Sequence, residues 1–278
     1  MKAAEALGHA RDRLAASNIE NASLESELLL RHALDVSRTR LYLELNQELD
    51  HPSETIFREL VERRLNHEPA AYITRHREFY GLDFSVNRDV LIPRPESELL
   101  VEKTLDLARD HHLATIADIG TGCGAIAISL ALNLPETRVY ATDVSAAALK
   151  VARRNCRKHG VINRIHLLAG DLVTPLPEPV DLMVANLPYV KQSEIDAGGF
   201  EPPLALSGGR DGLQKIHRLC RQSSAKLRPH GYLLLEIGQG QKEAVTTLLH
   251  HLFPGAEIET SPDLGGIERV VTLHNSPI

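Results

Sequence analysis

The sequence lacks the features that mark secreted, metal-binding and membrane proteins. Its three cysteines, Cys123, Cys156 and Cys220, are far apart and form no Cys-x-x-Cys pair. This spacing gives no support to a disulfide framework or a metal site and fits a reducing compartment. No apolar run approaches the ~20 residues of a membrane-spanning helix, and the N-terminus has no signal-peptide pattern. We therefore expect a cytoplasmic protein that has no membrane partner and binds no metal.

An excess of basic residues is also absent. The formal net charge is −6 over 278 residues, whereas a general nucleic-acid binder usually carries a basic face. No internal repeat or low-complexity segment is present. The length and the 43% hydrophobic content allow one large or two modest domains with a sizeable core. We expect a monomer without direct nucleic-acid contact.

The first third of the chain predicts two different structures. Residues 1–69 place apolar side chains at helical spacing and predict a small helical bundle. This bundle has no catalytic constellation, so it either supports the fold or recognises a macromolecular partner. Residues 70–92 are rich in aromatic and β-branched side chains and predict a β-hairpin linker. Its short strands are expected at Tyr72–Ile73, at Phe79–Tyr80 and Phe84–Val86 on either side of a turn at Gly81, and at Val90–Ile92.

Residues 93–278 alternate strand and helix patterns, which predicts an α/β domain with a parallel sheet covered on both faces. After a helix that ends near Asp110, strands are expected at 115–119, 139–142, 165–168, 180–185 and 231–237, with a closing antiparallel pair at 256–260 and 267–273. Later helices are expected at 212–227 and 241–252. The Pro- and Gly-rich residues 196–211 are a candidate lid. Ligands of such sheets bind beyond the carboxyl ends of the strands.

A glycine-rich turn follows the first of these strands. Gly120, Gly122 and Gly124, with Thr121 and Cys123 between them, connect Asp118 to a helix. Glycines let the backbone approach a ligand closely, and the N–H groups at a helix start can meet acceptor atoms. The turn matches the dinucleotide pattern G-x-G-x-x-A, but no second mononucleotide-binding half is evident. Its G-x-G-x-G form is typical of methyltransferases that use S-adenosylmethionine, and Cys123 is interpreted as a small turn residue.

An acidic residue ends the second strand of the domain. Asp143 stands where a carboxylate is placed to hold ribose hydroxyls, and Ser145 is expected to cap the following helix.

The four residues Asn186, Leu187, Pro188 and Tyr189 follow the fourth strand. The Asn186 side-chain oxygen can accept one N–H of a planar –NH2 group. Because Pro188 holds the preceding residue extended, the Leu187 carbonyl is aimed to accept the second N–H. Tyr189 offers a flat face for stacking. The segment predicts a site for an amide or aromatic amine, and an ordinary Asn-x-Pro turn is the alternative.

Four stretches together resemble the protein-(glutamine-N5) methyltransferases that act on peptide chain release factors. They are Phe79 to Glu98, with Ile-Pro-Arg-Pro-Glu; Asp118 to Ala125; Asn186 to Tyr189; and Glu201 to Leu213, with Gly-Gly-Arg-Asp-Gly-Leu. The resemblance covers nearly the whole chain, most loosely in the helical region.

The resemblance implies a fold, a cofactor and a substrate. It implies a seven-stranded Rossmann-like domain that binds S-adenosylmethionine through Gly120–Gly124 and Asp143, with Leu172 beside the adenine and Asn186 between cofactor and substrate. The implied substrate is the glutamine of a Gly-Gly-Gln loop in release factors. We expect residues 1–69 to recognise the substrate protein. The family commonly has Asn-Pro-Pro-Tyr, whereas this chain has Leu187 at the second position.

Three alternative functions remain open at this stage. A ribosomal-protein glutamine could be the acceptor in the same chemistry. A flipped DNA base could place its amino group in the same site, although the acidic charge disfavours DNA. The third alternative is a non-catalytic binding module that keeps the cofactor-shaped fold.

Overall fold

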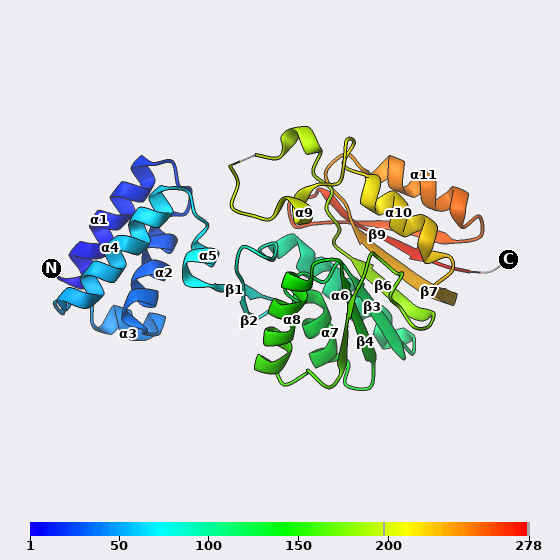
Figure 1. Cartoon of the computed structure of the whole chain (residues 1–278), viewed down its shortest axis with the longest axis horizontal. Helices are drawn as coiled ribbons and strands as arrows, with labels where there is room; N and C mark the ends of the chain where they lie inside the picture. Colours follow the sequence, from blue (N-terminus) through cyan, green and yellow to red (C-terminus); the bar gives the residue numbers. More distant parts are fainter. Residues whose placement is uncertain (197, 277–278) are drawn as a thin grey trace. The chain divides into compact units, whose positions relative to one another are not determined.

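A computed structural model describes residues 1–196 and 198–276 and divides the chain into two compact units, Met1–His76 and Arg77–Ile278. The division lies within the segment that the sequence predicts as a linker. The first unit is helical and the second contains the large sheet (Figure 1).

Helices build the first unit as predicted from the apolar spacing. Leu14, Leu29, Leu30 and Phe57 are among the buried residues of its core. Helix α4 begins after Asp50, whose carboxylate accepts the Ser53 backbone N–H at 2.7 Å. The helices are α1 (Ala3–Ala16), α2 (Ala22–Leu34), α3 (Arg38–Leu43), α4 (His51–Leu65) and α5 (Ala70–Thr74).

Helix α5 corrects the prediction for Tyr72 and Ile73, which were expected in a strand. Both side chains are buried, and Ile73 belongs to the core of the bundle. Packing against the other helices therefore outweighs the preference of aromatic and β-branched residues for strands.

A short hairpin follows, formed by β1 (His76–Phe79) and β2 (Leu82–Ser85). Tyr80 and Gly81 both have positive φ, which suits a two-residue hairpin turn. The predicted strand at Val90–Ile92 is absent. The Ile92 N–H instead donates to the Glu201 side chain at 3.0 Å, so a carboxylate takes the place of a strand partner.

The second unit contains a seven-stranded sheet in the order β5-β4-β3-β6-β7-β9-β8, as predicted for the fold class. Strand β9 runs antiparallel to both of its neighbours, β7 and β8, and the remaining pairs are parallel. The strands are β3 (Thr115–Ile119), β4 (Arg138–Asp143), β5 (Ile165–Ala169), β6 (Val180–Ala185), β7 (Leu227–Glu236), β8 (Glu257–Pro262) and β9 (Glu268–His274).

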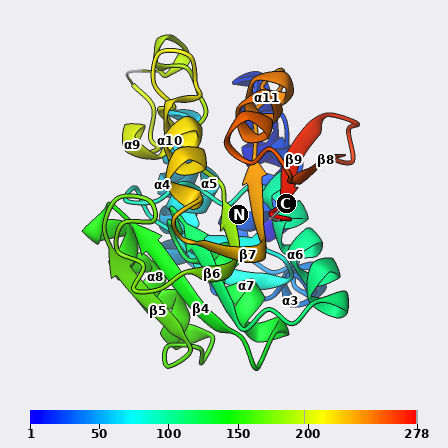
Figure 2. The same ribbon diagram turned by 90° about the vertical axis from the view of Figure 1, so that its right-hand side faces the viewer.

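Helices cover both faces of this sheet (Figure 2). α6, α7 and α8 are neighbours in one layer, and α10 packs beside α11 in the other. The bounds are η1 (Pro95–Ser97), α6 (Glu98–Asp110), α7 (Ala125–Asn133), α8 (Ala146–Lys158), η2 (Gln192–Glu194), α9 (Pro203–Leu206), α10 (Gln214–Ser223) and α11 (Lys242–Leu252).

Helix α10 is shorter at both ends than the helix predicted over 212–227. Gly212 has a φ of +78°, a left-handed conformation that cannot form part of a right-handed helix, and α10 begins only at Gln214. At the other end, Leu227 pairs with Val180, so the chain has already joined β7.

Asn155 on α8 ties three parts of the second unit together. Its Oδ1 accepts the Ser85 N–H at 2.9 Å, and its Nδ2 donates to the carbonyls of Ser85 and Cys123 at 3.0 and 2.9 Å. The side chain is fully buried. It therefore connects the hairpin and the glycine turn to a helix of the sheet domain.

Asn155→Ala should destabilise the protein by roughly 2–4 kcal/mol, because an N–H and two carbonyls lose their buried partner. Urea unfolding measures the change, with Asn163→Ala as the control because Asn163 is exposed. The control should stay within about 0.5 kcal/mol of wild type. Equal stability of the two variants would contradict this role of Asn155.

Within the described residues, no helix has both the length and the apolar composition needed to cross a membrane.

Candidate active site

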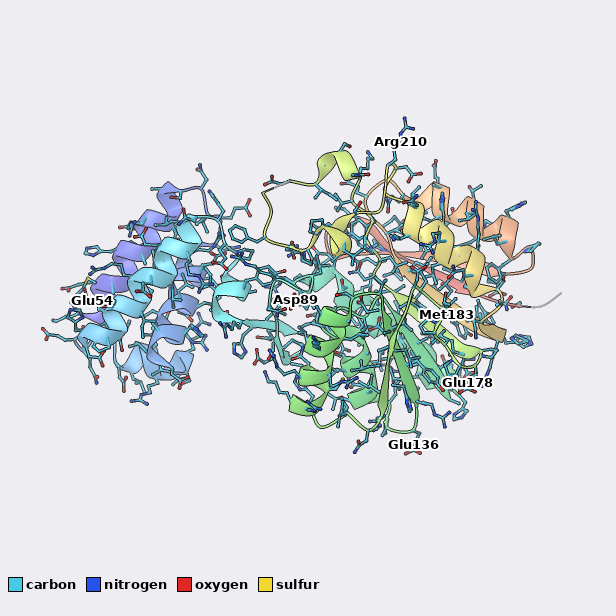
Figure 3. The ribbon with its side chains drawn as sticks, viewed as in Figure 1. Glu54, Asp89, Glu136, Glu178, Met183 and Arg210 are labelled. Atoms are coloured by element: carbon cyan, nitrogen blue, oxygen red, sulfur yellow. The ribbon has the colours of Figure 1, made fainter. Side chains whose placement is uncertain are left out.

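The predicted site residues meet at the carboxyl ends of the sheet strands. Gly120 follows β3, Asp143 ends β4, Leu172 lies shortly after β5 and Asn186 follows β6. All four line one cavity. Its wall also includes Gly122, Leu187 and Pro188, together with Asp89, which is labelled in Figure 3, and Pro202, Leu204 and Lys215.

The glycine turn is fastened to the end of β4. The N–H groups of Gly120 and Thr121 both donate to the Thr142 carbonyl at 2.9 Å. Gly120, Gly122 and Gly124 have positive φ values, so other residues would be strained there. A Cβ on Gly122 would meet no atom within 4 Å. The turn therefore presents an open backbone surface beside the cavity.

Asp143 connects the same turn to the next helix. Its Oδ2 accepts the Gly122 N–H at 2.9 Å, and its Oδ1 accepts the Ser145 N–H at 2.8 Å. Burial raises the pKa of Asp143, and these two N–H groups oppose the shift. A carboxylate has about four acceptor sites, so further capacity remains on the cavity side. Ser145 caps α8 as predicted, accepting the Ala148 N–H at 3.1 Å.

Three predicted cofactor residues shape the turn without lining the cavity. Thr121 donates its hydroxyl to Asp118 Oδ2 at 2.7 Å, and Gly124 is the N-cap of α7. Cys123 is buried, and burial raises the pKa of its thiol to about 12. The thiol is therefore not a ready nucleophile, as expected for a turn residue.

Asp118 sits beneath the turn. Its Oδ2 also accepts the Ala127 N–H at 3.2 Å. Burial raises its pKa to about 7, while the Thr121 hydroxyl lowers it.

Asn186, Leu187 and Pro188 line a second cavity as well as the first. The second cavity also contains Tyr189 and Arg94 among its lining residues. Three of the four residues of the predicted amide site thus lie on the wall shared by two cavities, and Tyr189 lines the second cavity alone. Leu187 is buried, and a Cβ on Gly120 would come within 3.0 Å of its Cδ2. Its side chain therefore packs against the glycine turn.

The Gly-Gly-Arg-Asp-Gly-Leu stretch packs against the backbone of Pro188 and Tyr189. A Cβ on Gly212 would lie 2.4 Å from the Tyr189 carbonyl oxygen, and one on Gly208 would lie 2.7 Å from the Pro188 carbonyl oxygen. Gln241 Nε2 donates to the Tyr189 carbonyl at 3.2 Å. These glycines allow a close backbone approach that fixes Pro188 and Tyr189.

Sequence reasoning missed two polar residues behind Asn186. Asn186 Nδ2 donates to Ser97 Oγ at 2.7 Å, and Ser97 Oγ donates to Glu236 Oε2 at 2.6 Å. Tyr189 Oη donates to Glu236 Oε1 at 3.2 Å. The signal for Glu236 was an acidic residue at the end of the apolar run Tyr232–Leu235, because such a position is rarely charged without partners.

The loop that the sequence suggests as a lid is joined to the segment before η1. Glu201 accepts the Ile92 N–H and forms an ion pair with Arg94. The Arg88 guanidinium lies over the Phe200 ring, 4.9 Å from its centroid. Of the predicted range 196–211, residue 197 lies outside the described residues.

Comparison with known proteins assigns the family. Residues 5–74 match a model described as the PrmC N-terminal domain, and residues 95–260 match the methyltransferase small domain. The release factor glutamine methyltransferase of Moorella thermoacetica is 43% identical over 95% of each chain. That of Cereibacter sphaeroides is 40% identical over 98% of each chain. The chain belongs to the release factor glutamine methyltransferase family.

Membership confirms the resemblance inferred from the sequence and makes the protein an S-adenosylmethionine-dependent methyltransferase. Solved structures of lower identity support the fold alone. The ribosomal protein L11 methylase of Lactobacillus delbrueckii is 19% identical, with a TM-score of 0.53 over 69% of this chain and 84% of that one. A methyltransferase from Pyrococcus furiosus is also 19% identical, with a TM-score of 0.52 over 72% and 91%.

The first cavity fits this cofactor chemically. The open backbone at Gly122 leaves space for an extended ligand, and Asp143 offers acceptors for hydroxyl groups. Thr142 also lines the cavity. Among the described residues, no group of His, Cys, Asp and Glu could hold a metal ion.

Proposed function

We propose that this protein transfers a methyl group from S-adenosylmethionine to the side-chain amide nitrogen (N5) of the glutamine in the Gly-Gly-Gln motif of a peptide chain release factor. The observation that carries the proposal is the position of Asn186 on the wall shared by two cavities. The curated relatives named above are release factor glutamine methyltransferases, which supports the same acceptor.

The second cavity has the groups that a primary amide requires. Asn186 Nδ2 is bonded to Ser97, so its Oδ1 is left to accept an N–H from the substrate. Pro188 restrains the Leu187 carbonyl, which accepts the other N–H. Tyr189 is held at its hydroxyl by Glu236 and at its carbonyl by Gln241, so its ring can lie against the amide plane.

An amide nitrogen is a weak nucleophile because its lone pair is delocalised into the carbonyl. S-adenosylmethionine supplies an electrophilic methyl group when it is bound. Asn186 and Leu187 orient the nitrogen by holding both of its hydrogens, and the nitrogen gives up one proton to solvent water after it gains the methyl group. No general base is needed before that step. Positioning of this kind can lower a barrier by roughly 7–11 kcal/mol.

A direct experiment tests this function. The purified protein is incubated with methyl-labelled S-adenosylmethionine and a release factor whose Gly-Gly-Gln glutamine is intact or replaced by glutamate. We expect label in the intact factor alone, with mass spectrometry placing the added methyl on that glutamine. Label at another residue, or equal label in both factors, would contradict the proposal. A purified ribosomal protein and a DNA duplex serve as further acceptors to test the alternative substrates.

The helical unit is proposed to recognise the release factor. The residues lining the two cavities all belong to the second unit. The bundle supplies none of these lining residues, so we propose that it acts outside the site by contacting the substrate protein, with structural support of the fold as the alternative. We propose that the enzyme acts in the cytoplasm as a monomer, without direct nucleic-acid contact.

A further inference from the structure

Four polar groups form a chain behind the proposed amide site. It runs from Asn186 through Ser97 to Glu236 and then to Tyr189, over hydrogen bonds of 2.7, 2.6 and 3.2 Å. Ser97 is 3% exposed and Glu236 is 1% exposed. These residues come from η1, from the end of β7 and from the segment after β6. Ser97 and Glu236 are thus withdrawn from water and depend on their neighbours in the chain for hydrogen bonds, whereas Asn186 and Tyr189 are partly buried.

When Glu236 is ionised, the donors in this chain can point in only one direction. An ionised carboxylate accepts hydrogen bonds and donates none, so Glu236 requires the hydroxyl hydrogens of both Ser97 and Tyr189. A serine hydroxyl has one hydrogen, so Ser97 can only accept from Asn186. Within that amide only Nδ2 can donate. The carboxylate therefore decides which end of the Asn186 amide faces the substrate, and that end is Oδ1.

The surroundings of Glu236 act on its pKa in both directions, and burial is the largest effect. Burial raises the pKa of Glu236, while the hydroxyls of Ser97 and Tyr189 and the positive charge of Arg269 lower it. The negative charge of Glu96 raises the pKa of Glu236, as burial does. Arg269 on β9 is itself paired with Asp263 at 2.8 Å.

We propose that Ser97 and Glu236 are positioning residues that lock the Asn186 amide with its oxygen toward the substrate, so that the site accepts a glutamine amide and rejects a carboxylate. This inference rests on the proposed function. With Oδ1 facing the substrate, an amide N–H finds an acceptor, whereas a glutamate carboxylate meets a second acceptor and is repelled. If the amide could turn over, Nδ2 would face the substrate and attract a carboxylate.

Ser97→Ala tests the lock, because it removes the acceptor for Nδ2 and leaves the Asn186 amide free to turn over. We expect methylation of the release factor to slow about 10-fold, the size expected from one lost buried hydrogen bond. The dissociation constant for S-adenosylmethionine should stay within about twofold of wild type, because Ser97 is not among the residues that line the first cavity. Ser97→Thr keeps a hydroxyl and should restore most of the rate.

The decisive readout is discrimination between two forms of the substrate. The dissociation constants of the intact factor and of its glutamine-to-glutamate form are measured by titration at about pH 8, well above the ordinary carboxyl pKa. Wild type should prefer the intact factor. The ratio meant here is the dissociation constant of the glutamate form divided by that of the intact factor. In Ser97→Ala this ratio should fall about 10-fold, partly because the glutamate form binds more tightly. General structural damage would weaken both forms together and leave the ratio unchanged.

Glu236→Gln provides an independent test if Ser97→Ala does not fold. Glutamine keeps the volume of Glu236 but can donate to Ser97, which lets the chain reverse, so the ratio should narrow in this variant too. An unchanged ratio in folded Ser97→Ala or Glu236→Gln overturns the inference. If wild type neither binds nor methylates the release factor, it is the proposed function that fails. If wild type methylates normally and the ratio does not move, only the role of Ser97 and Glu236 fails.

Discussion

Asn186→Ala is expected to reduce kcat/KM for methylation of the release factor by at least about 10- to 100-fold. The substitution removes Oδ1, which the proposed mechanism uses to accept an N–H of the substrate amide. A buried donor left without a partner costs about 1–3 kcal/mol. The substitution also removes Asn186 Nδ2. Ser97 Oγ then still donates to Glu236 but no longer accepts a hydrogen bond from residue 186.

The measurement is the initial rate of methyl transfer from labelled S-adenosylmethionine, followed over a range of release-factor concentrations. Asn163→Ala is the matched control because it removes the same side chain from an exposed position. The control should retain the wild-type rate. If purified, folded Asn186→Ala also does so, the role given to Asn186 is wrong.

Asp143→Ala should raise the dissociation constant for S-adenosylmethionine by about 10- to 150-fold. Hydrogen bonds to a charged group contribute roughly 1.5–3 kcal/mol each, and the carboxylate is the proposed acceptor for the ribose hydroxyls. It also holds the N–H groups of Gly122 and Ser145, so its loss loosens the glycine turn. Asp143→Asn retains one acceptor oxygen and should fall between alanine and wild type.

Isothermal titration calorimetry with the purified protein measures this effect without any methyl acceptor. Asp106→Ala is the control, because Asp106 lies on α6 in an exposed ion pair with Arg109. That variant should bind the cofactor as wild type does. Binding of S-adenosylmethionine by Asp143→Ala within twofold of wild type would remove Asp143 from the cofactor site.

The strands of the sheet were predictable because each buried strand is a short, continuous run of mostly apolar residues, which the local sequence shows directly. The run Val180–Ala185 is almost entirely apolar and matches β6 residue for residue, as expected for a parallel strand covered on both faces. Thr115–Ile119 matches β3 in the same way. By contrast, Tyr72 and Ile73 prefer strands by residue type, and only the packing of the bundle makes them helical.

The site was predictable in part for a similar reason. Asp143 ends β4 and Asn186 directly follows β6, so sheet geometry alone brings them to one edge. Ser97 reaches the site over 89 residues of sequence separation from Asn186, and Glu236 over 139 from Ser97. No local spacing links them, and Ser97 reads from the sequence as an ordinary residue at a helix start. Only the tertiary structure shows that they share hydrogen bonds.

The placement of β9 between β7 and β8 has a consequence during protein synthesis. β7 and β8 are both synthesised before the strand that joins them, so neither β8 nor this edge of β7 has its partner until β9 has been made. At ~5–20 residues per second, the delay between the end of β7 and the completion of β9 lasts a few seconds. In that interval the nascent chain carries an apolar, unpaired strand edge that is open to chaperones or to aggregation.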